Sequence, residues 1–317
     1  MYFTIITNQI IILGFLAMLG VIATKFKVIT ELVKNSIATI VFNLTLPALI
    51  LTSVSTVELN QKLLSNSLLV FILSHIGILF LYLTGKLSRY LFGIKGKKGN
   101  IHVVHTMLGN VAFLGYPLFS ALFPGGEGLF YAVIFHLTQD IYIWTISVFE
   151  FNNTKNVQFK ESLKHLLNPN MVAFLVGIMM LIFGVQFPEL LNKPIAGLGK
   201  TTIYLAMLYI GAVLAQNPMM KAFKKKEIYI LIFNKMLLVP VILIFIINLI
   251  ATFFHIEIDI VAKTVVVMQT SMPCMAMVVV LAKKFGSDDI HATENLFIST
   301  ILSFATLPLV YYLVQIL

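Results

Sequence analysis

Thr270-Ser271-Met272-Pro273-Cys274 lies in the middle of an apolar stretch that runs from Val261 to Ala282. A second proline, in Gly115-Tyr116-Pro117, interrupts the apolar residues 101 to 122. A proline inside a helix removes a backbone donor and clashes with the preceding turn, and lipid supplies no replacement for the lost hydrogen bond. The two stretches therefore predict two broken helices that form a solute site near the bilayer midplane.

The composition indicates an integral membrane protein. Of the 317 residues, 59% are hydrophobic and 11% are charged, and the mean hydropathy is +0.96. A soluble domain of this length could not cover itself with polar surface at that composition. Connections between the apolar stretches are short and no Ser/Gly-rich or Pro-rich linker is seen, so residues 1–317 are expected to form a single membrane unit.

The apolar stretches predict an all-α fold with ten transmembrane helices. A hydrocarbon core about 30 Å thick needs roughly 20 apolar residues per helix. With that window the predicted spans are 5–24, 35–56, 66–85, 101–122, 128–149, 167–187, 201–216, 228–250, 262–282 and 290–314. The first span has no basic n-region and no small-residue cleavage site, so it is expected to be retained rather than removed as a signal peptide.

The basic residues predict the orientation, because they fall in alternate connections. One set holds seventeen of them, namely Lys25, Lys27, Lys34, Lys86, Arg89, Lys95, Lys97, Lys98, Lys155, Lys160, Lys164, Lys221, Lys224, Lys225, Lys226, Lys283 and Lys284. The other set holds four, namely Lys62, Lys193, Lys200 and Lys263. By the positive-inside rule the first set faces the cytoplasm, which places both termini outside the cell. These loops and the anionic inner leaflet explain the net charge of +9, so no nucleic-acid partner is expected.

The span order predicts an inverted repeat. A cut at the polar segment 150–166 leaves two halves of five spans, residues 1–150 and 167–317. Leu46-Pro47-Ala48-Leu49-Ile50-Leu51 in the second span is similar to Ile210-Gly211-Ala212-Val213-Leu214-Ala215 in the seventh. The broken fourth and ninth spans also occupy equivalent positions, and each is followed by a Gly-bearing acidic turn. Because five is odd, the second half must cross the membrane in the opposite sense.

Several motifs together resemble the auxin efflux carrier family. They are Asn110-Val111-Ala112-Phe113-Leu114-Gly115-Tyr116-Pro117-Leu118, Ser271-Met272-Pro273, Leu281-Ala282-Lys283-Lys284-Phe285-Gly286-Ser287-Asp288, Ser299-Thr300 and Thr306-Leu307-Pro308. The resemblance covers the span count and order of the whole chain. It implies a fold similar to bile-acid symporters and sodium/proton antiporters, with broken helices that cross near Pro117 and Pro273. It also implies a scaffold of spans 1, 2, 6 and 7, a transport domain of spans 3–5 and 8–10 that slides like an elevator, and a homodimer through the scaffold.

The resemblance also narrows the expected function. Bacterial members are described as permeases for malate, malonate and similar organic acids, whereas plant members export auxin. The long central loop of the plant members is missing here, since only a short segment around Asn152 to Lys164 stands in its place. This favours a secondary transporter of small organic anions in a bacterial plasma membrane. The alternatives are an ion-coupled cation/proton antiporter and an auxin-like monocarboxylate exporter, while a channel or an enzyme is disfavoured because no continuous polar pore and no catalytic motif is found.

Backbone electrostatics predicts how such a site would hold its anion. A half-helix N-terminus presents unpaired N–H groups and a partial positive charge, so two facing N-termini can hold a carboxylate without arginine. The substrate-binding candidates are Asn43, Asn110, Gly115, Pro117, Gln139, Ser271 and Pro273. The amide of Asn110 either binds the carboxylate or satisfies the break, and Asn43 either lines the site or bonds the carbonyl that Pro47 leaves free. Cys274-Met275-Ala276-Met277 makes the second half of the site more apolar than in other family members.

Asp140 is the candidate for a coupling ion. An unpaired Asp in hydrocarbon costs several kcal/mol, so its carboxyl must face a cavity, pair with a cation or stay protonated. Two interpretations follow, namely that Asp140 carries a coupling proton or sodium ion, or that it forms a purely structural pair with Lys235. Intramembrane histidines such as His136 are expected to pack or to bond their helix. The single Cys274 and the scattered histidines predict neither a metal site nor a cofactor.

Overall fold

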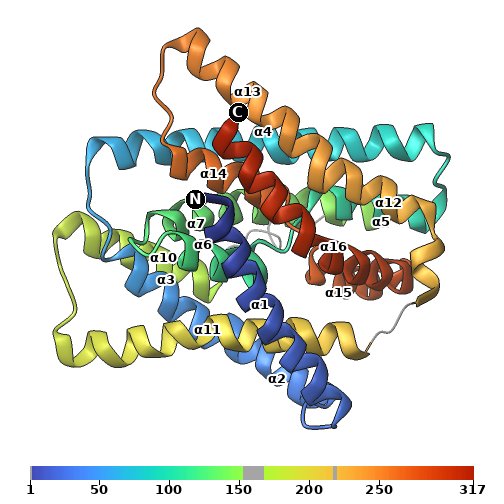
Figure 1. The fold of residues 1–317 in the computed structure, drawn as a ribbon, viewed down its shortest axis with the longest axis horizontal. Helices are drawn as coiled ribbons and strands as arrows, with labels where there is room; N and C mark the ends of the chain where they lie inside the picture. The colour runs from blue at the N-terminus through green and yellow to red at the C-terminus, as the bar shows by residue number, and fades with distance from the viewer. Residues whose placement is uncertain (1, 153–167, 217–219) are drawn as a thin grey trace.

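The computed structural model describes residues 2–152, 168–216 and 220–317, and these residues are almost entirely helical (Figure 1). In chain order the first half contains α1 (Tyr2–Lys25), α2 (Glu31–Ile40), η1 (Val41–Thr45), α3 (Leu46–Val54), α4 (Gln61–Leu91), α5 (Gly96–Met107), η2 (Val111–Gly115), α6 (Tyr116–Leu122), α7 (Glu127–Tyr142), η3 (Ile143–Ser147) and α8 (Val148–Asn152). The second half contains α10 (Pro169–Phe183), α11 (Glu189–Gln216), η4 (Met220–Lys224), α12 (Lys226–Phe233), η5 (Asn234–Leu238), α13 (Val239–Phe254), α14 (Ile260–Thr270), α15 (Ala276–Lys284) and α16 (Asp289–Ile316).

Seven helical stretches of the described chain are long and apolar enough to cross a membrane. They are Ile6–Lys25, Glu31–Val54, Gln61–Leu91, Glu127–Phe151, Glu189–Ala215, Lys226–Phe254 and Asp289–Ile316. Shorter apolar helices cover Val111–Leu122, Pro169–Phe183 and Ile260–Thr270, and every stretch overlaps a predicted span. Lys155, Lys160 and Lys164 of the charge pattern lie outside the described residues.

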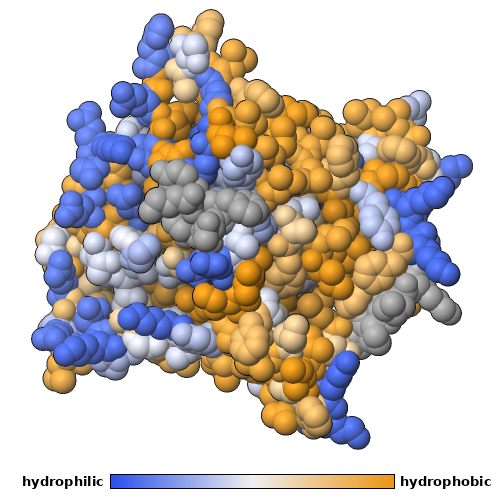
Figure 2. Space-filling view, in the orientation of Figure 1, coloured by the Kyte–Doolittle hydropathy of each residue, from blue (hydrophilic) through white to orange (hydrophobic). Residues whose placement is uncertain are grey.

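The surface matches a lipid environment. Large apolar side chains such as Leu190 and Leu249 are 85% and 69% exposed, which water would penalise and hydrocarbon does not. Figure 2 shows hydrophilic residues gathered toward the two ends of the long axis, with apolar side chains covering the zone between them. This zone is the part of the surface that lipid would solvate.

Most helices pack in two sets, which are joined where α1 packs on α16 and α3 packs on α7. Figure 1 shows α4 and α11 along opposite sides of the molecule, both close to the direction of the long axis. On one side α1 packs along α11, and α3 packs on α10 and α11. The backbones of α1 and α11 approach closely where Gly20 faces the Leu208 carbonyl and Gly211 faces the Ala17 carbonyl. On the other side α4 packs on α5, α7 and α14, while α16 packs on α14 and α15.

Prolines widen these helices more often than they break them. Pro47, Pro117 and Pro240 each lie two residues after the end of a π-helical turn, in η1, η2 and η5 respectively. A π turn is wider than an α turn and bonds residue i to residue i+5, so the helix can continue past a residue that has no N–H group. The prediction that Pro117 breaks its span is therefore wrong, because residues 111–122 form one continuous helical stretch.

The actual break in this span covers residues 108 to 110. Leu108 has φ −100° and ψ 127°, and Asn110 has φ −80° and ψ 61°. Gly109 and Asn110 are poor helix formers, which favours unwinding here. In the later span the break lies between α14 and α15 and includes Pro273, as predicted. Gly109 and Cys274 form an isolated antiparallel bridge, so the two unwound segments meet inside the molecule.

Candidate functional site

The crossing of the two unwound segments is held by hydrogen bonds to buried backbone groups. The N–H of Asn110 donates to the Pro273 carbonyl at 2.8 Å, and the N–H of Cys274 donates to Oγ of Ser299, on α16, at 3.0 Å. His105, on α5, places Nε2 3.2 Å from the Met275 carbonyl oxygen. Unwound backbone within a membrane must find such internal partners. The crossing is therefore a built part of the fold.

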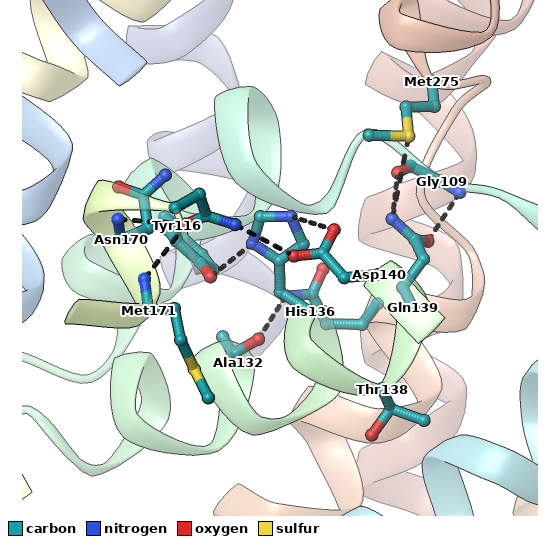
Figure 3. Close-up of polar contacts among 12 residues, drawn as sticks. Gly109, Tyr116, Ala132, His136, Thr138, Gln139, Asp140, Asn170, Met171 and Met275 are labelled. Atoms are coloured by element: carbon teal, nitrogen blue, oxygen red, sulfur yellow. Dashed lines mark hydrogen bonds and ion pairs between the residues drawn. The ribbon is translucent and has the colours of Figure 1, made fainter. Parts of the chain in front are cut away.

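Gln139 fastens the first unwound segment to α7. Its Oε1 accepts the N–H of Gly109 at 2.9 Å, and its Nε2 donates to the Gly109 carbonyl at 3.0 Å, as Figure 3 shows. The side chain is only 1% exposed. Gln139 was predicted as a substrate ligand, but here both ends of its amide are used by Gly109. It holds the backbone on which the site is built.

Two helix N-termini meet at this crossing. One helical stretch begins at Val111 and the other at Ala276. In the first stretch the earliest backbone hydrogen bond runs from the Leu114 N–H to the Asn110 carbonyl at 3.4 Å. In the second stretch it runs from the Val278 N–H to the Met275 carbonyl at 3.2 Å. The N–H groups of residues 111–113 and 276–277 come before these bonds and have no acceptor within their helix. Both ends therefore carry partial positive charge.

A cavity of about 380 Å³ lies beside the two N-termini. Residues 110–113 and 275–277 form one side of it, and α2, η1 and Tyr209 of α11 form the opposite side. Tyr209 contacts Phe113 across the cavity, with ring centroids 4.8 Å apart. Such a volume suits a small organic molecule. None of the described lysines or arginines lines it.

The cavity brings together some of the predicted site residues. Asn110 lines it, and its side-chain amide makes no hydrogen bond within the described part of the chain. Asn43 lines it from the opposite wall, where its Nδ2 donates to the Thr39 carbonyl at 3.0 Å. Asn43 therefore does not bond the carbonyl that Pro47 leaves free, which is its own. Pro273 contributes its carbonyl to the crossing.

The other candidates do not line this cavity. Gly115 packs against Gln269, since a Cβ added at Gly115 would lie 2.6 Å from Oε1 of that side chain. Pro117 is buried and is the second residue of α6. The hydroxyl of Ser271 donates to the Met268 carbonyl at 2.8 Å. The structure thus gives Gly115, Pro117 and Ser271 packing or backbone contacts.

Asp140 forms a buried polar chain with one residue each of α6 and α7 and with the N-cap residue of α10. Its Oδ1 lies 3.5 Å from Nε2 of His136, and its Oδ2 accepts Nδ2 of Asn168 at 3.4 Å. Nδ1 of His136 lies 2.7 Å from the Tyr116 hydroxyl (Figure 3). The alternative of a structural pair with Lys235 is wrong, because the Lys235 ammonium donates to the Thr106 carbonyl at 3.1 Å instead.

His136 has contacts at the site that its sequence position alone did not predict. It lines the cavity, so it connects that space to the Asp140 carboxyl. Expected only to pack or bond its helix, it bonds across to Tyr116. The signal was available in the sequence, since His136 and Asp140 are four residues apart and must share one face of a helix.

A helical membrane protein whose broken helices direct two N-termini at an internal cavity has the architecture of a transport protein. The sequence matches the family described as "Membrane transport protein" over residues 5–311. The chain therefore belongs to this family, which is the auxin efflux carrier family that its motifs indicate.

Two archaeal relatives match nearly the whole length of the chain. The chain is 26% identical over 313 residues to an uncharacterized transporter of Methanocaldococcus jannaschii, with 95% of this chain and 96% of the relative covered. It is 25% identical over 312 residues to an uncharacterized transporter of Methanothermobacter thermautotrophicus, with 96% of each chain covered. The likeness thus includes both broken helices.

Proposed function

We propose that the protein is a secondary active transporter of small organic anions, of the malate or malonate type, and that it works by alternating access. The observation that carries this proposal is the meeting of two helix N-termini at one cavity that no described lysine or arginine lines. Each N-terminus is equivalent to about +0.5 elementary charge. Two of them together balance roughly the charge of one carboxylate. Neither a lysine ammonium nor a bidentate arginine is then needed to bind it.

The lining of the cavity supports binding of a carboxylate in a defined orientation. The free N–H groups at residues 111–113 and 276–277 and the unbonded amide of Asn110 are donors on one side. Asn35, Thr39 and Asn43 lie four residues apart along α2 and η1 and form a polar stripe on the opposite side. A short dicarboxylate would place one carboxylate at the N-termini and the other at this stripe.

The proposed motion is an elevator-like displacement of one helix set against the other. The chain would form ten spans in two inverted repeats, with α1–α3, α10 and α11 as scaffold and α4–α8 and α12–α16 as transport domain. The packing supports this division, since the crossing is bonded to α5, α7 and α16 but the facing cavity wall belongs to α2, η1 and α11. We further propose a homodimer through the scaffold and extracellular termini.

Asp140 is the proposed site of a coupling proton or sodium ion. Its carboxyl is 6% exposed and touches His136, a residue of the cavity wall. A change in its charge would alter the field that a bound carboxylate experiences. We expect Asp140→Asn to change the dependence of uptake on pH or sodium while the protein still inserts. An unchanged response to both ions would exclude this role.

A monocarboxylate with an apolar body is the second candidate substrate. Phe42, Phe113, Met277 and Val280 give the cavity an apolar lining that a small dicarboxylate does not need. An aromatic acid of the auxin type would use the N-termini for its carboxylate and this lining for its ring.

The deciding experiment is uptake into proteoliposomes of purified protein. Labelled malate, malonate and indole-3-acetate would be supplied in parallel, with imposed proton or sodium gradients. Saturable, gradient-dependent flux of one of the acids is the expected result. Ohmic current without saturation would contradict a carrier, and uptake of none of the three acids would contradict the substrate class.

A further inference from the structure

Lys235 is a buried cation that the proposed binding site does not use. Its side chain is 0% exposed and lies in the π turn η5, which packs against α4, α5 and α16. No carboxylate of the described chain lies within salt-bridge distance of its ammonium. A cation in so apolar a place needs a compensating negative partner.

That partner is the C-terminal end of the broken helix α5. The Lys235 ammonium donates to the carbonyl of Thr106, in the last turn before the break, at 3.1 Å. The last carbonyls of a helix have no intrahelical donors and carry partial negative charge. At this end of α5 the Val104 carbonyl accepts a hydrogen bond from the Leu108 N–H at 2.9 Å. The Thr106 carbonyl accepts its hydrogen bond from the Lys235 ammonium instead.

The broken helices therefore have two electrically different ends near the crossing. The N-termini at Val111 and Ala276 face the cavity and suit an anion. The C-terminus of α5 faces Lys235. In transporters built from broken helices, unwound carbonyls and half-helix C-termini are where a coupling cation is usually coordinated. Here a side chain of the protein already holds such an end.

We infer that Lys235 is a tethered cation that takes the place of a dissociable metal cation at the C-terminal end of α5, so that this crossing needs no sodium ion. The π turn supports the assignment, because Lys235 is buried there together with Asn234 and Met236, and π turns occur frequently at functional sites. The inference refines the proposed function by limiting its coupling ion to one bound elsewhere, such as a proton at Asp140.

The test measures thermal unfolding of the purified full-length protein in sodium chloride and in choline chloride at equal ionic strength. All variants are compared in the Asp140→Asn background, which removes the other proposed cation site, and in that background the midpoint should be the same in both salts. Lys235→Met, which keeps the volume but removes the charge, should lower the midpoint by about 5 °C in either salt. Lys235→Ala vacates the space beside the Thr106 carbonyl, and its midpoint should be higher in sodium than in choline.

Lys263→Met is the matched control, because Lys263 is also buried but lies in the first turn of α14, and its ammonium bonds no helix carbonyl of the described chain. It should change the midpoint by less than Lys235→Met does. An Asp140→Asn midpoint that rises specifically with sodium would overturn the inference, as would a Lys235→Met midpoint equal to that of the same Asp140→Asn background. These measurements need no substrate, so a failure of organic-acid uptake leaves their outcome separate.

Discussion

Replacement of Gln139 by Leu tests whether the crossing depends on a single side chain. The Gln139 amide is the bridge between α7 and the unwound Gly109, with one bond to the N–H at 2.9 Å and one to the carbonyl at 3.0 Å. Leu fills a similar volume but can neither accept nor donate. Both backbone groups of Gly109 would then remain buried without these partners.

The expected cost follows from those two bonds. A buried hydrogen bond contributes about 1 kcal/mol net, and a backbone group left without a partner costs about 1–3 kcal/mol. Two such groups are left, so Gln139→Leu should lower the free energy of unfolding by about 2–6 kcal/mol. At about 2 °C per kcal/mol for a chain of this size, the unfolding midpoint should fall by roughly 4–12 °C.

The assay is thermal unfolding in detergent, followed by uptake in proteoliposomes. Thr138→Val is the control, because Thr138 is equally buried and adjacent but bonds only the Ile134 carbonyl of its own helix. Gln139→Glu should give an intermediate midpoint when its carboxyl is protonated, since its carbonyl oxygen can still accept from the Gly109 N–H and its O–H can donate to the Gly109 carbonyl. If Gln139→Leu unfolds at the wild-type temperature, the bridge does not hold the crossing.

Three further predictions follow from the geometry. Asn110→Asp puts a carboxylate at the two N-termini, so it should weaken organic-anion uptake at least about 10-fold. The control Asn60→Asp keeps the N-cap of α4 and should transport normally. Equal uptake by both variants would contradict the proposed binding site. Gly211→Ala places a Cβ against the Ala17 carbonyl and should lower the free energy of unfolding by about 1–3 kcal/mol. The control Gly197→Ala meets open space and should not lower the unfolding midpoint. Equal midpoints for the two variants would refute the close packing of α1 on α11. Burial favours a higher pKa for Asp259, but the Lys62 ammonium at 2.6 Å and the N–H groups of Val261 and Ala262 hold that pKa below its usual value. Its stabilising effect is present above the ordinary carboxyl pKa and is lost as the pH falls through the lowered one, so midpoints measured against pH should show an acid step that Asp259→Asn reduces.

The sequence predicted the membrane helices because their signal is local. Apolar length and loop charge are properties of consecutive residues, so each of the seven long membrane helices lies on a predicted span. The break in the ninth span was also predicted correctly, since Pro273 lies in the unwound segment between α14 and α15. The ten-span inverted repeat and the direction of insertion stay predictions.

The first break could not be located from the proline rule alone. Pro117 and Pro273 look alike as sequence, yet Pro117 follows a π turn and its helix continues. The unwound residues are Leu108 to Asn110 instead, where Gln139 and Pro273 supply partners for the freed backbone groups. Those partners come from distant positions in the chain, so the residues around Gly109 do not predict them.

Composition, the length of the apolar stretches and the proline at position 273 by themselves determined that this chain is a helical membrane protein with an interrupted helix. Only the tertiary structure decided which N–H groups face the cavity, that the Gln139 amide is already occupied, and that Asp140 contacts His136 while Lys235 contacts α5. The physical reason is that helix formation depends on neighbours within one turn. The partner of a buried polar group, by contrast, depends on how separate helices come together.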